Sequence, residues 1–295
     1  MQIQRCTVCN SEQVSILKAY EKHKLTKCTE CSMVFAWDIP DSRELIAHYE
    51  EYGRDDYKSP ITVKRYREIL SKFEHARSLN RILDIGCGMG FFLEVAQELN
   101  WKTYGTEYTE TAVENCRQKD ITMFKGDLSE INFGELTFDV ITCIEVIEHI
   151  QDLHSFISGI KKILRPGGLL YLTTPNIRSL NSRMLKEDWN VLCYPEHLSY
   201  FSKKSLNKLL ESNSFEKLFL VSDGVSPERL LTSIKRKTVD HSTSENKDEK
   251  LRIQLEKNSF LKTVKRMVNG LLNTLNLGES LKGLYRFTHD DRILP

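Results

Sequence analysis

The segment LDIGCGMG, residues 83–90, decides the fold of this chain of 295 residues. An apolar run from Arg81 leads into the segment, and a helical pattern over 91–99 follows it, so a strand, a glycine-rich turn and a helix succeed one another. Glycine permits a sharp turn and lets the backbone approach a ligand closely. The third glycine comes too early for a dinucleotide fingerprint, and the missing Lys-Ser/Thr pair excludes a P-loop.

Acidic residues stand where the first three predicted strands end. Asp84 suits a ligand with an ammonium group and would repel a pyrophosphate. Glu107 ends the second strand, about 20 residues beyond the loop, where an acidic side chain suits a ribose diol. After the third strand, Asp127 can accept a hydrogen bond from an adenine amine, and Leu128 can pack on the ring. An amine, a ribose and an adenine together are features of S-adenosylmethionine.

Strand and helix patterns alternate over residues 80–222, which predicts an α/β core whose parallel sheet is covered on both faces. The expected strands are 81–85, 101–107, 121–125, 138–144, 169–174 and 215–221. The expected helices are 91–99, 109–119, 153–164 and 202–211. The run Arg-Pro-Gly-Gly at 165–168 predicts a helix stop before the fifth strand.

The chain resembles the class I S-adenosylmethionine-dependent methyltransferases over roughly residues 60–222. The resemblance rests on the glycine-rich loop, on Glu107, and on three further motifs in the family's order: GDL at 126–128, FDVI at 138–141 and LRPGG at 164–168. It implies a Rossmann-like, doubly wound, seven-stranded sheet with an antiparallel last strand, for which 281–287 is the candidate. The expected cofactor contacts are Asp84, Gly86, Cys87, Gly88, Gly90, Glu107, Tyr108, Asp127, Leu128 and Glu145.

Four cysteines near the N-terminus form two C-x2-C pairs that are separated by 18 residues. They are Cys6, Cys9, Cys28 and Cys31. Two such pairs can place four sulfurs at the corners of a tetrahedron, and the spacing is that of a zinc ribbon. Because four cysteine ligands leave no position for water, we expect a structural zinc ion. Two disulfides or unrelated thiols are the alternative. We assign 1–37 to the ribbon, 38–79 to a helical connector and 80–222 to the methyltransferase core.

The residues after the fourth strand should face the methyl acceptor, because ligands of open α/β sheets bind beyond the carboxyl ends of the strands. The segment IEVIEHI, residues 144–150, places Glu145, Glu148 and His149 on one face if it is helical. It resembles the Glu-x-x-Glu-His motif of ubiquinone-pathway O-methyltransferases and of small-RNA 3′-end ribose methyltransferases. His197 is a further candidate, in a run that resembles the lid of glycan and natural-product methyltransferases.

Three interpretations of these catalytic candidates, His149, Glu148 and His197, stay open. In the first, His149 or His197 is a general base for the acceptor hydroxyl. In the second, the two histidines together with Glu145 and Glu148 bind Mg²⁺ or Mn²⁺, as the resemblance to the ribose methyltransferases implies. In the third, the two glutamates orient loops and only His149 touches the substrate.

The expected reaction is methyl transfer to a hydroxyl of a small molecule, a sugar or glycan precursor. A ribbon joined to such a core by a Tyr-rich helix, 47–52, resembles a bacterial arrangement among sugar and polysaccharide methyltransferases. In the predicted lid, 177–200, Arg178 or Arg183 can hold an anion and Trp189 a sugar ring, or these side chains simply pack. The alternatives are an RNA ribose 2′-O-methyltransferase, a sugar C-methyltransferase, and a non-catalytic cofactor-binding assembly module.

The composition of the chain and the pattern of its C-terminal residues limit which binding partners we expect. Lys and Arg number 42 against 41 Asp and Glu, so the net charge of +1 gives no support to nucleic-acid binding. No apolar run reaches the length that spans a bilayer, and we expect a cytoplasmic protein. Residues 223–295 are predicted to be a helical insertion and the final strand. Within them, 250–277 carries an apolar stripe that could dock on a membrane surface, pack on its own domain, or form a homodimer.

Overall fold

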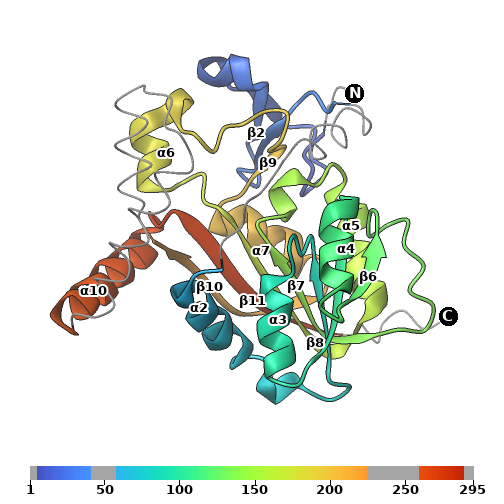
Figure 1. Ribbon diagram of the computed structural model, residues 1–295. Helices are drawn as coiled ribbons and strands as arrows, with labels where there is room; N and C mark the ends of the chain where they lie inside the picture. The colour runs from blue at the N-terminus through green and yellow to red at the C-terminus, as the bar shows by residue number, and fades with distance from the viewer. Residues whose placement is uncertain (1–4, 41–57, 225–258, 289–295) are drawn as a thin grey trace.

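The computed structural model describes residues 5–40, 58–224 and 259–288 (Figure 1). These residues form a seven-stranded sheet with helices on both faces, and a four-stranded sheet at one end of it. None of the helices in the described ranges is long and apolar enough to cross a membrane.

The large sheet has the strand order β10-β11-β8-β7-β4-β5-β6. Its strands are β4 (Arg81–Ile85), β5 (Lys102–Glu107), β6 (Thr122–Lys125), β7 (Phe138–Ile144), β8 (Leu164–Pro175), β10 (Phe215–Asp223) and β11 (Ser280–Phe287). β11 lies antiparallel between β10 and β8, and all other neighbours are parallel. The predicted Rossmann-like sheet with an antiparallel last strand is therefore confirmed.

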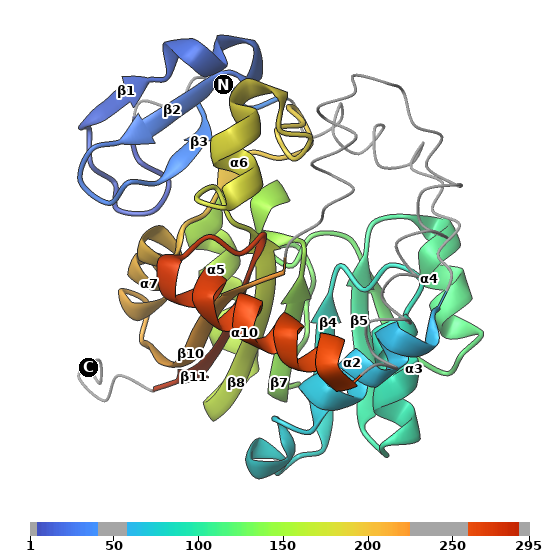
Figure 2. The same cartoon turned by 90° about the vertical axis from the view of Figure 1, so that its left-hand side faces the viewer.

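Helices cover both faces of this sheet, as a doubly wound fold requires. The α-helices are α2 (Pro60–Leu70), α3 (Phe91–Glu98), α4 (Glu110–Arg117), α5 (Leu153–Ile163), α6 (Leu180–Leu185), α7 (Lys203–Glu211) and α10 (Ser259–Leu275). The 3-10 helices are η1 (Lys18–His23), η2 (Glu74–Ala76), η3 (Ile147–His149) and η4 (Lys186–Asp188). Figure 2 shows α2, α3 and α10 on one face of the sheet.

Alternation along each strand divides the apolar side chains between two cores. Ile82 of β4 packs with residues of α2 and α3, whereas its neighbour Leu83 packs with residues of α5 and α7. Successive side chains of a strand point to opposite faces, so a central strand must be apolar throughout. One element departs from the prediction: 165–168 lies inside β8, where the pairing with β7 is irregular between Phe138 and Val140. A turn composition is tolerated there because the ladder is interrupted.

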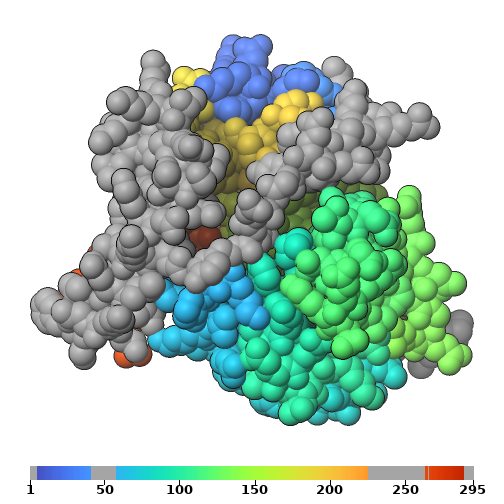
Figure 3. All heavy atoms as spheres, viewed as in Figure 1, coloured from blue at the N-terminus to red at the C-terminus, as the bar shows by residue number. Residues whose placement is uncertain are grey.

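The small sheet joins the N-terminal module, residues 5–40, to the core. Its order is β1 (Val14–Ile16), β2 (Leu25–Cys28), β3 (Val34–Ala36) and β9 (Ser199–Tyr200). Ala36 N donates to Leu198 O at 2.8 Å, and Leu198 N donates to Glu148 O at 2.8 Å. Backbone hydrogen bonds thus run from the module through 177–200 to η3. In Figure 3 the yellow residues of 177–200 lie between the blue module and the green core.

The part of the predicted connector that the structure describes contains the helices α2 and η2. α2 begins at Pro60, and the hydroxyl of Ser59 accepts from Thr62 N at 3.2 Å. Proline in the first turn and serine as N-cap both favour a helix start. The Tyr-rich helix predicted at 47–52 lies outside the described residues.

Candidate active site

The glycine-rich loop turns sharply between β4 and α3. Gly86, Gly88 and Gly90 have φ angles of 66°, 52° and 77°, which lie in the left-handed region that favours glycine. A Cβ placed on Gly88 would meet no protein atom within 4 Å, and the same holds for Gly126 after β6. Both backbone segments therefore face open space, as a loop that receives a ligand should.

Glu107 and Asp127 are held in place by hydrogen bonds at the ends of β5 and β6. Glu107 accepts from Gly88 N at 3.0 Å and from Tyr108 N at 2.8 Å. Asp127 accepts from the Tyr108 hydroxyl at 2.6 Å and from Ser129 N at 2.8 Å. Burial disfavours the charged form of Asp127, but the hydrogen bonds from Ser129 and Tyr108 bring its pKa below the ordinary value. Two carboxyl groups that accept hydrogen bonds thus border one pocket.

The pocket lies beyond the carboxyl ends of β4, β5 and β6. Its walls are Ile85, Gly86, Thr106, Glu107, Tyr108, Gly126, Asp127, Leu128, Val146, Ile150 and Phe156. Polar acceptors on one side and apolar side chains on the other suit a ribose and an adenine ring. The residues present therefore fit S-adenosylmethionine. Sequence reasoning missed the apolar wall of Ile150 and Phe156, although Ile150 closes the segment 144–150 that it had selected.

Asp84 lies beneath the loop and is absent from the pocket wall. It is 4% exposed, and Thr142 Oγ1 donates to its Oδ1 at 2.6 Å. Burial raises the pKa of Asp84 to about 7, although the hydrogen bond from Thr142 opposes that shift. The contact with an ammonium group that we expected from the sequence stays a prediction.

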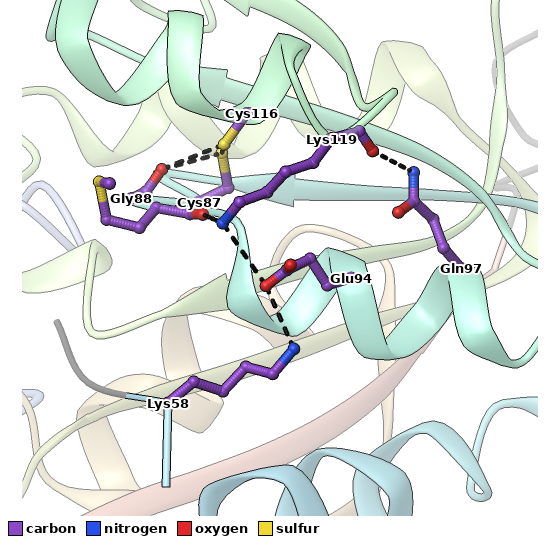
Figure 4. A network of polar contacts seen from close by, with 8 residues as sticks. Lys58, Cys87, Gly88, Glu94, Gln97, Cys116 and Lys119 are labelled. Atoms are coloured by element: carbon purple, nitrogen blue, oxygen red, sulfur yellow. Dashed lines mark hydrogen bonds and ion pairs between the residues drawn. The ribbon is translucent and has the colours of Figure 1, made fainter.

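Cys87 is absent from the pocket wall, and its side chain lies in a polar and sulfur-lined network beside the loop (Figure 4). Its Sγ lies 4.0 Å from Cys116 Sγ, and Cys116 Sγ lies 3.4 Å from Gly88 O. Lys119 Nζ donates to Met89 O at 2.8 Å and lies 3.5 Å from a carboxylate oxygen of α3. The network fixes the loop, so Cys87 can meet a ligand through its backbone alone.

Glu148, His149 and His197 come together where η3 meets the segment 177–200. One ligand atom from each lies within 4.8 Å of those of the other two, and the imidazole centroids are 4.6 Å apart. Val146 and Ile150, which flank η3, both line the pocket. The predicted catalytic candidates are thus neighbours of one another and of the pocket.

Both imidazoles are oriented by backbone carbonyls. His149 Nδ1 is 2.9 Å from Glu196 O, and His197 Nδ1 is 2.8 Å from Val191 O. A carbonyl oxygen only accepts, so Nδ1 carries the proton in each ring. In the neutral tautomer the lone pair is then on Nε2, which is the atom required of a base or a metal ligand.

The two glutamates differ in their surroundings. Glu148 is 2% exposed, and its Oε2 has no hydrogen-bond partner within the described residues. Burial, and then the charge of Glu145, raise the pKa of Glu148 well above its ordinary value. Glu145 has a φ of 55° and accepts from Thr173 Oγ1 at 2.7 Å. Because the segment is not a continuous helix, Glu145 does not join the cluster of Glu148 and the two histidines.

Two residues of the predicted lid have packing roles. Trp189 is 1% exposed, and its Nε1 lies 3.4 Å from Glu279 Oε1. Tyr194 stacks under the Lys24 ammonium, with 4.6 Å from Nζ to the ring centroid. Arg178 and Arg183 are exposed. Of the side chains proposed for an acceptor, the arginines are therefore accessible, and Trp189 is part of the core.

The four N-terminal cysteines form a compact sulfur cluster. The Sγ atoms of Cys6 and Cys31 are 3.4 Å apart, and those of Cys9 and Cys28 are 3.6 Å apart. Zinc–sulfur bonds of about 2.3 Å at tetrahedral angles place sulfurs about 3.8 Å apart. All four are free thiols. The donor set and its spacing therefore fit a zinc ion, and the disulfide alternative is not observed.

Comparison with known proteins agrees with this geometry. A family model described as a methyltransferase domain matches residues 56–218, which is more than half of the chain. The chain belongs to this family. The matched residues include the loop, the pocket and both acidic residues at its rim, and the fold is that of the class I methyltransferases.

Curated relatives match part of this chain. A probable S-adenosylmethionine-dependent methyltransferase of Mycolicibacterium smegmatis is 26% identical over 155 residues, 52% of this chain and 58% of the relative. A ubiquinone biosynthesis O-methyltransferase of Methylococcus capsulatus is 30% identical over 112 residues, 36% of this chain and 47% of the relative. The chain thus spans about half the length of these relatives.

Solved structures share the fold. A methyltransferase from Archaeoglobus fulgidus superposes with a TM-score of 0.52 at 21% identity and covers 83% of this chain and 100% of its own. The magnesium protoporphyrin IX methyltransferase of Synechocystis, with bound S-adenosylhomocysteine, gives a TM-score of 0.51 at 14% identity, covering 84% of this chain and 100% of its own.

Proposed function

We propose that this protein transfers the methyl group of S-adenosylmethionine to a hydroxyl of a small molecule, a sugar or glycan precursor. The observation that carries the proposal is the pair of imidazoles, His149 and His197, whose Nδ1 atoms are bound to carbonyls beside the cofactor pocket. A hydroxyl must lose its proton during transfer, and an oriented Nε2 lone pair can receive it. The O-methyltransferase relatives and the bacterial sugar-tailoring arrangement noted in the sequence support oxygen in a small acceptor.

The residues have separate tasks in this reaction. The bound cofactor supplies an electrophilic methyl carbon on a positively charged sulfur. Glu107 and Asp127 hold the adenosyl part, and the apolar wall excludes water from the transfer path. When bound, the cofactor would give its methyl group to the acceptor oxygen, and its sulfur would keep the electron pair of the broken bond. The hydroxyl proton passes to Nε2 of His149 or of His197.

A second candidate mechanism uses a divalent cation. Glu148, His149 and His197 offer a carboxylate and two imidazoles within 4.8 Å, which is a donor set for such an ion. We propose that, if Mg²⁺ or Mn²⁺ assists transfer, these three residues hold it and the ion orients the acceptor oxygens. Activity that is unchanged by EDTA excludes this mechanism, whereas loss and recovery with one of the two ions supports it.

We further propose a structural zinc ion at the four N-terminal cysteines and a cytoplasmic setting for the enzyme. The free thiols support both, because a reducing compartment preserves such a site. The short path of backbone hydrogen bonds from Ala36 to Glu148 supports a task for the module, which is to hold the catalytic face in place.

The deciding experiment supplies labelled S-adenosylmethionine with sugar, nucleotide-sugar and phenol acceptors. We expect His149→Ala and His197→Ala to lower kcat by about 10²–10⁴-fold with little change in S-adenosylhomocysteine affinity. His75→Ala, at an exposed histidine remote from the pocket, is the matched control and should keep full activity.

Each alternative has its own result in the same assay. Label on a carbon atom of the product indicates a C-methyltransferase, and label on an RNA 2′-hydroxyl indicates a ribose methyltransferase. Tight cofactor binding without turnover on any acceptor indicates an assembly module and contradicts the proposal. Full activity of both histidine variants contradicts the assigned base.

A further inference from the structure

Helix α10 is attached to the core by its polar edge. It packs along β10 (Figure 2). Its Leu272 is buried, at 7% exposure. Asn273 Oδ1 accepts from Ser222 N at 2.9 Å and from Lys203 Nζ at 2.7 Å, and Leu272 O accepts from Ser222 Oγ at 3.3 Å. An asparagine therefore occupies the inner side, where a surface helix ordinarily buries apolar residues.

The apolar stripe of α10 faces outward instead. Its members are separated by three, one, three and four residues, so they share one side of the helix. They are Val264 at 39% exposure, Met267 at 70%, Val268 at 45%, Leu271 at 60% and Leu275 at 52%. They are five of the nine large apolar residues that the described chain exposes. These five side chains are therefore not packed on their own domain, whereas Leu272 is.

The charge on this part of the chain has one sign. From Lys257 to Gly278 the sequence contains Lys257, Lys262, Lys265 and Arg266 and neither Asp nor Glu. A cationic helix with an exposed apolar stripe has the composition of helices that lie in the interface of an anionic bilayer. The cations would meet lipid headgroups while the stripe enters the acyl boundary.

We propose that α10 docks this protein on an anionic lipid surface. A second copy is the competing occupant of the stripe. A second copy would add another set of cations from α10 without an acidic partner from that helix, and like charge opposes association. An anionic membrane has the complementary charge, so the observations favour lipid over a dimer.

The test is flotation of the full-length protein with phosphatidylcholine vesicles, with and without phosphatidylglycerol, at low and high salt. We expect flotation with the anionic vesicles and weakening by salt. Leu271→Glu and Met267→Glu should each lower the bound fraction at least tenfold. Ile16→Glu is the matched control, because Ile16 is 62% exposed, as Leu271 is 60% exposed, but lies in the N-terminal module.

The outcomes separate cleanly. Thermal melting and S-adenosylhomocysteine binding test whether each variant is folded. Because Met267 and Leu271 do not line the pocket, a folded variant should bind as the wild type does. Equal flotation of Leu271→Glu, Met267→Glu and wild type overturns the proposal, as does a wild type that floats with neither vesicle. Light scattering that shows a dimer, lost in Leu271→Glu while vesicles stay unbound, assigns the stripe to a second copy. Because flotation needs no acceptor, its failure leaves the methyl-transfer proposal standing.

Discussion

Replacing Gly88 by alanine offers a direct test of the cofactor loop, because Gly134 provides a matched control. The φ angles are 52° at Gly88 and 56° at Gly134, and a Cβ on either would meet no protein atom within 4 Å. The two positions differ in what lies beside them. Gly88 donates to the Glu107 carboxylate at the pocket, whereas Gly134 lies in the turn that precedes β7.

The expected magnitudes follow from this match. A side chain in the left-handed region costs about 1–2 kcal/mol, so Gly88→Ala and Gly134→Ala should lower the free energy of unfolding to a similar extent. Only the methyl group at Gly88 would intrude on a bound ligand. Overpacking of one methyl group costs about 1–3 kcal/mol, which corresponds to about 5- to 150-fold weaker binding.

Calorimetric titration with S-adenosylhomocysteine and urea unfolding measure the two effects separately. We expect similar unfolding midpoints for the two variants and weaker binding for Gly88→Ala alone. If Gly88→Ala binds as tightly as Gly134→Ala, the backbone at Gly88 does not approach the ligand, and our placement of the cofactor is wrong.

Three further predictions concern metal content and stability. Cys28→Ser should lose the zinc that elemental analysis finds in the wild type, and equal zinc in both would exclude the cysteine cluster as its site. Asp139 is fully buried and accepts from Arg165 Nε at 2.5 Å, so Asp139→Asn should cost about 3 kcal/mol in urea unfolding. Burial opposes the charge of Asp139, but the hydrogen bond from Arg165 brings its pKa below the ordinary value. The contribution of Asp139 to the free energy of unfolding is therefore present above about pH 4 and is lost as the pH falls through the folded-state pKa. The pKa of Asp84 is instead raised to about 7 by burial, so its contribution is present below about pH 4 and is lost as the pH rises to 7. Ligand-free Asp84→Asn should therefore gain stability relative to wild type as the pH rises from about 4 to about 7, and a constant difference over that range would contradict the raised pKa.

The sequence predicted those elements whose conformation is determined by residues close to them in the chain. The loop at 83–90 and the ends of β5 and β6 follow from local apolar runs and glycines, whereas the position of β11 came from the family resemblance. Glu107 and Asp127 were found because parallel strands bring their carboxyl ends to one edge of the sheet. Zinc-type cysteine spacing is likewise a local signal, and the structure brings the four sulfurs together.

Contacts between distant segments could not be predicted in this way. His149 and His197 are close because the segment 177–200 folds back over η3. The course of such a segment cannot be predicted from the periodicity of apolar residues. The inward burial of Asp84 depends on Thr142 in the neighbouring strand. Helical spacing identified the stripe of α10, but its outward orientation depends on Asn273 and its partners in β10 and α7.

The fourth strand of the small sheet limits how this architecture could have arisen and how it can be engineered. β9 is contributed by a segment some 160 residues beyond β3, so the N-terminal module does not complete its own sheet. A gene fragment that ends after the module would encode an open edge of three strands, prone to pair with other chains. Recombination at that boundary would separate the donors of β3 from their acceptors beside His197. Exchange of such modules between enzymes should therefore succeed only when the partner segment is transplanted with them.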